Sequence, residues 1–479
     1  MARIVRQSKV WHDLERELPP GLQELQYFLW TLSEFDAELV RALREERGHG
    51  RDDHPVSAMW NLIAIGLYLR NGKFSELLAE LNRNSDLARL LGFEEIGPNQ
   101  YKIPSDSALS RFHVKLKDHY LDKVEAVFKK TVQALASENP EFGKHTSIDA
   151  SDVRTHARPG PKAPESEDSP TQEEGPEEAE GKEGKEGKEG KETSSDPEAS
   201  WSVKTKTWED GQGKKRKTTK STFGYKLYAT ADSAIPAIVA IEVETGKTSD
   251  QKMAIPMIDA ARENLDDNRM ETVAMDKGFD SESNIREANE RGVAAIVPVR
   301  EVPENLDRQP KEDREEPLSP GGNVVYDRYS GEVACYESSD DDNEEPTRRT
   351  MTYAGFEADR ATHKFRCPLG GTAATACKVF HCCAAGPSGS QGRQVRVSME
   401  TDYRRFAPVY PRSKRWKRLY NGRSAVERIN SYLKEVLQLE RHCLRGKNAI
   451  KLRVLFASIT LNVRTLVSLR AQKALAQAA

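Results

Sequence analysis

The sequence has few cysteines, no apolar run that we identify as long enough to span a membrane, and no signal-peptide pattern. The 479 residues include six cysteines, carry a formal net charge of −3 and are 37% hydrophobic. Six cysteines in so long a chain exclude a disulfide-stapled scaffold. The longest apolar run that we identify, residues 58–69, is too short to cross a bilayer, and the N-terminus shows no signal-peptide pattern. We therefore expect a soluble, cytoplasmic protein of two or three domains with no membrane partner.

The near-zero net charge hides an uneven distribution. Residues 404–453 contain fifteen lysines and arginines but only three glutamates, of which Glu427 is the first. A basic region of this kind favours a polyanionic partner. On a helix, Tyr420, Arg423, Glu427 and Lys434 fall within one arc of about 60°. A single carboxylate among cations suits a Mg²⁺ ion beside phosphates, and a solvated charged helix face is the alternative.

Residues 1–140 show helical patterns. Apolar residues at helical spacing predict helices over residues 56–68, 74–91 and 105–116. The last of these begins at Ser105, which can cap it, and follows another helix and a Gly-Pro loop. It is a candidate recognition helix of a helix-turn-helix, with Ser107 and Arg111 facing DNA, and a capped core helix is the alternative.

The middle of the chain alternates strands and helices. The predicted order is strand, strand, strand, helix, strand, helix, strand, over residues 145–151, 223–231, 235–243, 251–264, 271–275, 281–291 and 293–299. This is the ribonuclease-H-like order, an α/β fold with a mixed five-stranded sheet flanked by helices. Its first and fourth strands are adjacent, so Asp149 and Asp276 would meet at one edge. The helix that carries Glu427 would cross the sheet beside them.

A segment of low complexity interrupts this core. Residues 159–220 are dominated by Pro, Gly, Glu, Lys and Ser and include a repeated Glu-Gly-Lys unit. Such a composition cannot bury a core, so we expect a disordered, solvated linker within the α/β core. Its last residues, Lys214–Lys217 and Lys220, are basic and form a candidate DNA contact.

The spacing Tyr420-x2-Arg423-x3-Glu427-x6-Lys434 resembles the YREK signature of insertion-sequence transposases, the group typified by insertion sequence four. Residues 276–280, with the sequence Asp-Lys-Gly-Phe-Asp, are similar to the second-aspartate motif of that group. The resemblance implies a DDE transposase with a ribonuclease-H-like catalytic domain.

This resemblance also implies a catalytic mechanism and an N-terminal domain. Residues 54–112 resemble the helical DNA-binding domain found in many of these transposases. The resemblance assigns catalysis, and the binding of two Mg²⁺ or Mn²⁺ ions, to Asp149, Asp276 and Glu427. Asp280 is the alternative to Asp276, although we expect it to cap the following helix.

The remaining signature residues are expected to bind the substrate. Tyr420, Arg423 and Lys434 would hold the phosphate beside the scissile bond, and Trp416 is a candidate to stack on a displaced base. The implied partners are double-stranded DNA, as element ends and target, and a second copy of the chain in a nucleoid-associated homodimer. A metal-dependent nuclease of the same fold and a catalytically inactive DNA-binding protein are the alternatives.

Residues 301–410 break the alternating pattern, and in the family a β-rich insertion lies here, before the helix of the catalytic glutamate. Cys367, Cys377 and Cys382 are candidate ligands of a structural Zn²⁺, and buried or free thiols are the alternative. We expect a helical DNA-binding domain, a first core part, the insertion and a second core part at residues 1–140, 141–300, 301–410 and 411–479.

Overall fold

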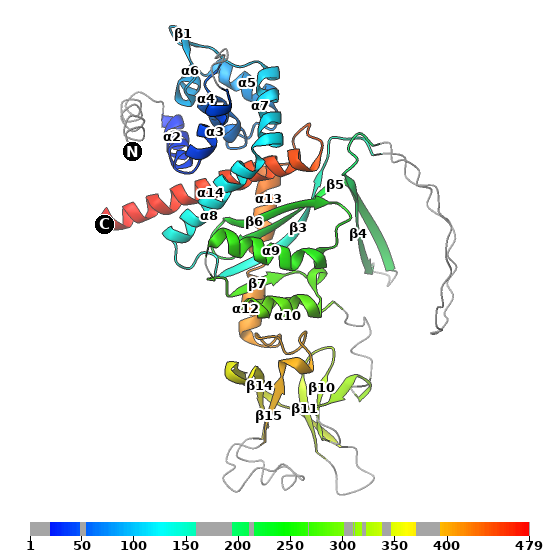
Figure 1. Cartoon of the computed structure of the whole chain (residues 1–479). Helices are drawn as coiled ribbons and strands as arrows, with labels where there is room; N and C mark the ends of the chain where they lie inside the picture. Colours follow the sequence, from blue (N-terminus) through cyan, green and yellow to red (C-terminus); the bar gives the residue numbers. More distant parts are fainter. Residues whose placement is uncertain are drawn as a thin grey trace.

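The structure, a computed structural model, describes residues 20–47, 54–159, 194–209, 215–266, 268–300, 310, 312–318, 322–337, 346–369 and 393–478. Helices lie at one end, a mixed sheet in the middle and a β-rich part at the other end (Figure 1). The chain thus combines an N-terminal helical region with an α/β core and a β-rich part.

The N-terminal region is helical, as predicted. Its elements are α2 (Pro20–Ser33), α3 (Ala37–Arg47), α4 (Val56–Gly66), α5 (Phe74–Arg83), α6 (Ser85–Leu91), the short strands β1 (Glu95–Gly97) and β2 (Gln100–Tyr101), α7 (Asp106–His119) and α8 (Leu121–Glu138). The single helix predicted over residues 74–91 is wrong. Asn84 is extended and its side chain accepts a hydrogen bond from the Leu87 amide, so it ends α5 and caps α6. Ser105 caps α7 as predicted, by accepting from the Ala108 amide.

The central sheet has the predicted strand order. Its strands are β3 (His145–Arg154), β4 (Ser200–Glu209), β5 (Lys215–Asp232), β6 (Ile238–Thr245), β7 (Thr272–Met275) and β8 (Ala294–Ile296). The order across the sheet is β6-β5-β3-β7-β8, in which β3 runs antiparallel to β5 and parallel to β7. These are the five predicted strands, and β4 is an additional strand that pairs with the first half of β5. The predicted linker therefore extends too far, because residues 200–209 and 215–220 belong to strands.

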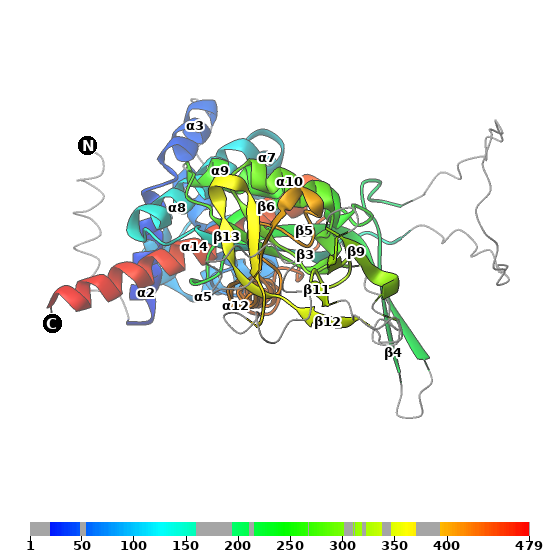
Figure 2. The same ribbon diagram turned by 90° about the horizontal axis from the view of Figure 1, so that it is seen from below.

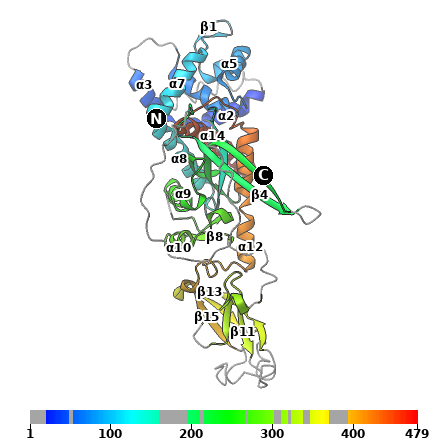
Figure 3. The same cartoon turned by 90° about the vertical axis from the view of Figure 1, so that its right-hand side faces the viewer.

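Helices cover both faces of this sheet. One face carries α9 (Asp250–Leu265) and α10 (Glu282–Glu290). The other carries α12 (Lys414–Asn421) and α13 (Ser424–Ser431), which together form one rod that runs from the β-rich end to the sheet (Figures 1 and 3).

The last helix, α14 (Lys447–Ala478), joins the two halves of the molecule. It packs against α8, α2 and α7 on one side and β6 on the other. Its length and apolar composition would suffice to cross a bilayer, so residues 58–69 are not the longest apolar stretch. However, 72% of its most apolar window is buried inside the protein. Burial in the core accounts for its apolar sequence.

The β-rich part lies between β8 and α12 in the sequence. It contains β9 (Glu315–Pro317), β10 (Val324–Asp327), β11 (Val333–Glu337), β12 (Thr347–Thr350), β13 (Thr352–Glu357), β14 (Thr362–Arg366) and β15 (Gln394–Ser398). They form two antiparallel sheets around a small separate core that includes Phe365, Phe406 and Tyr410. In the view from below, these sheets lie in front of the central core (Figure 2).

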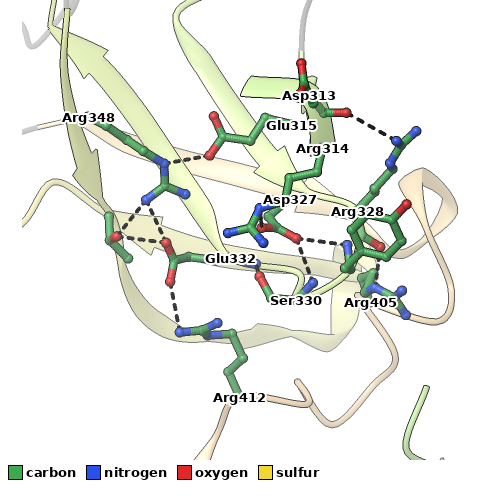
Figure 4. Close-up of polar contacts among 12 residues, drawn as sticks. Asp313, Arg314, Glu315, Asp327, Arg328, Ser330, Glu332, Arg348, Arg405 and Arg412 are labelled. Carbon is green, nitrogen blue, oxygen red and sulfur yellow. Dashed lines mark hydrogen bonds and ion pairs between the residues drawn. The ribbon is translucent and has the colours of Figure 1, made fainter. Parts of the chain in front are cut away.

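Partly buried ion pairs connect segments of the β-rich part. Arg348 contacts both Glu315 (2.6 Å) and Glu332 (2.7 Å), and Glu332 also pairs with Arg412 at 2.9 Å (Figure 4). Arg348, Glu315 and Glu332 are largely removed from water, whereas Arg412 is partly exposed, so the loss of Arg348 would leave two buried carboxylates poorly compensated.

Candidate functional site

Two aspartates meet at the edge of the sheet, on the face that α12 and α13 cover. The register of β3 and β7 pairs Ser147 with Ala274 and Ile148 with Met275, so Asp149 and Asp276 occupy the next matching positions. Asp276 comes directly after β7, where its Oδ1 accepts from the Gly278 amide at 2.7 Å. The predicted meeting of these two acids at one edge is therefore what the strand pairing produces.

The environment of Asp149 disfavours its ionised form. Burial and, next, the negative charge of Asp276 raise the pKa of Asp149 from 3.8 to about 6. Three groups act in the opposite direction: the Asn430 side chain, the Ala150 amide and the positive charge of Arg423. Two carboxylates so close together form a site of concentrated negative charge that would favour a cation.

Asn430 is a site residue that the sequence analysis missed. It lies on α13, is 6% exposed, and donates a hydrogen bond from Nδ2 to Asp149 Oδ2 at 3.0 Å. Its Oδ1 is buried and accepts no hydrogen bond in the part of the chain that the structure describes. The available signal was its position three residues after Glu427, which places both on one helix face.

The signature residues on α12 and α13 form a continuous ladder. Trp416 and Tyr420 are stacked, with ring centroids 4.9 Å apart, and the Arg423 guanidinium lies 5.6 Å from the Tyr420 ring. Arg423 then forms an ion pair with Glu427 at 2.9 Å. Each step spans three or four residues, as expected for neighbours on one helix face. The ladder leads from Trp416, partly buried beside β7 and β8, to the acids at the sheet edge.

Lys434 lies in a π-helical turn, Tyr432–Val436, which ends the helix earlier than the predicted position near Arg441. Single π turns of this kind are often found at functional sites. The Lys434 ammonium donates to the backbone carbonyl of Asp152 and pairs with Glu440 at 3.4 Å. Lys434 therefore lies beside β3, three residues along from Asp149.

The three predicted acids do not form a closed cluster. Asp149 and Asp276 are together, but the side chain of Glu427 is 50% exposed and pairs with Arg423. Among the residues that the structure describes, no group of three or more His, Cys, Asp or Glu side chains is arranged to hold a metal ion. Arg423 interacts electrostatically with both Asp149 and Glu427, so its positive charge acts on both acids.

The other predicted site residues lie elsewhere. Ser107 and Arg111 are exposed on α7, in the N-terminal helical region and away from the acids (Figure 1). Cys367 is a free, partly buried thiol, whereas Cys377 and Cys382 lie outside the described residues, so the zinc prediction stays untested.

The prediction that Asp280 caps the helix after it is wrong. Its side chain is fully buried, accepts from the Arg300 amide at 2.7 Å and pairs with Arg404. Ser281 instead occupies the position before α10. Asp280 therefore links the core to the segment that returns from the β-rich part, and it is not free to serve as the second acid.

A comparison with protein families agrees with this geometry. The family model described as "Transposase DDE domain" matches residues 140–463, which span the sheet, the β-rich part and the helices that carry Glu427. The chain belongs to the DDE transposase domain family. No curated protein matches this transposase closely enough to add a relative. The match begins just before β3 and ends within α14, so it includes every residue of the acidic edge and of the ladder.

Proposed function

We propose that this DDE transposase, a member of the YREK group typified by insertion sequence four, cuts DNA at the ends of an insertion sequence and joins the freed 3′-OH ends to target DNA. The observation that carries this proposal is the pair of carboxylates, Asp149 and Asp276, beneath the helix of Glu427 and Arg423. The division of labour among residues 1–140, 141–300, 301–410 and 411–479 is part of the same proposal.

The donor set at the acidic edge fits divalent metal ions. Asp149 and Asp276 supply carboxylate oxygens, and the buried Asn430 Oδ1 is an unused oxygen beside them. Oxygen donors of this kind suit Mg²⁺ or Mn²⁺. When bound, two such ions would activate the attacking oxygen and stabilise the departing 3′-oxygen.

Arg423 and Glu427 would act together when DNA arrives. In the structure, Arg423 neutralises Glu427 and lies close to Asp149. A substrate phosphate offers Arg423 a stronger, bidentate partner than an exposed carboxylate. When the Arg423 side chain moves from Glu427 to the phosphate, the Glu427 carboxylate would become free. Glu427 could then join Asp149 and Asp276 as the third acid. Substrate binding and completion of the acidic triad would then be one event.

The remaining ladder residues would position the DNA. Lys434 would hold a second phosphate as a point charge, and Tyr420 would orient Arg423 from below its guanidinium plane. Trp416 already stacks on Tyr420, so a displaced base would extend an existing stack. Ser107 and Arg111 would contact the element end from the exposed side of α7. The partner is double-stranded DNA, held by a homodimer in the cytoplasm.

The test uses the full chain and a duplex that carries the inverted repeat flanking its gene. Asp149→Ala, Asp276→Ala and Glu427→Ala should each abolish Mg²⁺- or Mn²⁺-dependent end cleavage while leaving end binding in a gel-shift assay intact. Undiminished cleavage by any of the three would remove the role given to that residue. Cut ends that are never joined to a target plasmid would indicate a nuclease, and binding without any cleavage would indicate a DNA-binding protein only.

A further inference from the structure

The strand β4 and the first half of β5 form a ribbon that leaves the core sheet. Ten residue pairs connect them, from Ser200 opposite Gly224 to Glu209 opposite Lys215. β3 and β6 pair with β5 only from Gly224 and Tyr225 onward, so the ribbon beyond that point has two strands. It projects from the side of the molecule (Figures 1 and 3).

The base of the ribbon is held firmly. A Cβ at Gly224, whose φ is +154°, would overlap the carbonyl oxygen of Val153, so only glycine permits this close approach of β5 to the end of β3. Nearby, Asp196 accepts hydrogen bonds from Thr155 (2.6 Å) and Tyr225 (2.7 Å). These contacts fix the direction in which the ribbon leaves the body.

The charges on the ribbon oppose its own folding. Its two strands contain six lysines and arginines and a single acid by sequence, counted over residues 200–209 and 215–224. Lys204 and Lys220 are directly opposite each other in the register, and like charges at such positions destabilise a strand pair. Lys204 has one acidic partner, Asp152 at 3.1 Å, whereas Lys220 forms no ion pair within the described chain.

The ribbon also exposes apolar side chains. Val203 is 61% exposed and Trp208 is 44% exposed, on a two-stranded element that has no core of its own. Isolated two-stranded ribbons are only marginally stable in water. Exposed apolar groups combined with cations, of which Lys220 has no acidic partner among the described residues, favour an anionic partner that also offers apolar contacts. The major groove of duplex DNA offers both, because phosphates line its rims and thymine methyl groups lie on its floor.

A groove connects the ribbon to the candidate active site. It has a volume of about 640 Å³ and is lined by four cations, Lys204 and Lys220 from the ribbon, Arg154 from β3 and Lys434 from the helix of Glu427, and by three acids, Asp152, Glu435 and Glu440. Arg154 is exposed and has no acidic partner among the described residues. Two of the three acids are already paired, Asp152 with Lys204 and Glu440 with Lys434, so Arg154 and Lys220 are groove cations without an acidic partner among the described residues.

We propose that the β4–β5 ribbon is a second DNA-contact element, which lies against the duplex beside the scissile phosphate and holds it with Lys204 and Lys220. This inference rests on the proposed function and adds to it a surface that lies outside the signature residues. A two-stranded ribbon fits the major groove of B-form DNA. Ten pairs at about 3.3 Å each span about 33 Å, close to one helical turn of roughly 34 Å.

The experiment measures DNA affinity against salt for the full chain. The probes are a labelled duplex with the flanking inverted repeat and a scrambled duplex of the same length, each of about four helical turns. The double variant Lys204→Ala/Lys220→Ala should bind both probes on the order of tenfold more weakly and lower the salt slope by about 2. Lys204→Arg/Lys220→Arg should retain wild-type affinity, because both cations remain.

The control removes the same charge from a distant surface. Lys129→Ala/Lys473→Ala deletes two lysines that pair with Glu263 and Glu138, on α8 and α14, away from the ribbon. This variant should match wild type in affinity and salt slope. All variants should melt within several degrees of the wild type, because each substitution removes at most exposed or partly exposed ion pairs, which contribute about 0–1 kcal/mol each.

Each outcome decides the proposal. Ribbon variants with unchanged affinity and slope would overturn it while leaving the transposase function in place, provided that the wild type binds and cuts. A wild type that neither binds nor cuts the duplex would instead overturn the proposed function. If light scattering showed that the Lys204→Ala/Lys220→Ala variant no longer forms the dimer while its DNA affinity is unchanged, the ribbon would contact a second copy of the chain. That result would also overturn the proposal.

Discussion

Replacing Asp149 by asparagine should stabilise the metal-free protein and destroy its catalysis. The pKa of Asp149 is raised from 3.8 to about 6, first by burial and then by the charge of Asp276. Each unit of pKa corresponds to about 1.4 kcal/mol, so the ionised carboxylate costs the metal-free fold roughly 3 kcal/mol at neutral pH. An asparagine side chain is nearly isosteric with aspartate and keeps an oxygen to accept from Asn430, so the substitution removes the charge and leaves the packing.

The stability gained by Asp149→Asn should increase with pH. The folded protein keeps a proton on Asp149 between about pH 4 and 6, whereas the unfolded chain releases it, so stability falls as pH rises through that interval. The advantage of Asp149→Asn should therefore be absent near pH 4 and reach its full value above about pH 6. Saturating Mn²⁺ should stabilise the wild type and leave the variant unchanged, because only the wild type offers the carboxylate.

The assay is urea unfolding in EDTA and in Mn²⁺, at several pH values, followed by tryptophan fluorescence. Asp152→Asn is the matched control three residues along β3. Although burial opposes it, hydrogen bonds from Ser202 and Lys204 and the charge of Lys204 lower the pKa of Asp152, so its loss should destabilise the protein. An Asp149→Asn variant that is less stable than the wild type in EDTA at neutral pH would refute the reasoning.

Three further predictions concern individual side chains. Asn430→Ala removes a donor from Asp149, so the pKa of Asp149 should rise further and Mn²⁺ affinity near neutral pH, measured by calorimetry, should fall several-fold. Arg423→Gln should tighten Mn²⁺ binding on the order of tenfold, because a cation beside Asp149 and Glu427 is lost, yet it should slow cleavage; a parallel fall in both would contradict the role given to Arg423. Burial raises the pKa of Asp36, which accepts from Trp60, to about 6, so Asp36→Asn should stabilise the protein by up to about 3 kcal/mol in urea unfolding at neutral pH and by nothing near pH 4.

Strand order and the two aspartates were predictable because both depend on local pattern. Asp149 ends a short β-rich stretch and Asp276 follows a short apolar run, and the alternation of strands and helices leaves few topologies in which such strands are not neighbours. The ladder from Trp416 to Glu427 was likewise visible as helical spacing. These features require no knowledge of distant contacts.

Other features depend on contacts that a local pattern does not contain. The strand character of residues 200–209 is visible in their Thr, Val and Trp content, but the composition of the surrounding segment outweighed it. Arg423 and a metal ion compete for the carboxylate of Glu427, and in the structure Arg423 holds it. The spacing of residues along the sequence cannot decide this competition. Asp280 resembled a helix cap because its partner, Arg404, lies 124 residues further along the chain.

Two places in this transposase bring like charges together, and they have a common explanation. Asp149 and Asp276 repel each other at the sheet edge, and Lys204 and Lys220 repel each other on the ribbon. Neither arrangement stabilises the free protein, so each is understood through a ligand of opposite charge. Divalent cations would neutralise the acids and DNA phosphates the lysines. Because a bound phosphate would also draw Arg423 from Glu427, loading of the DNA and assembly of the metal site are expected to favour each other.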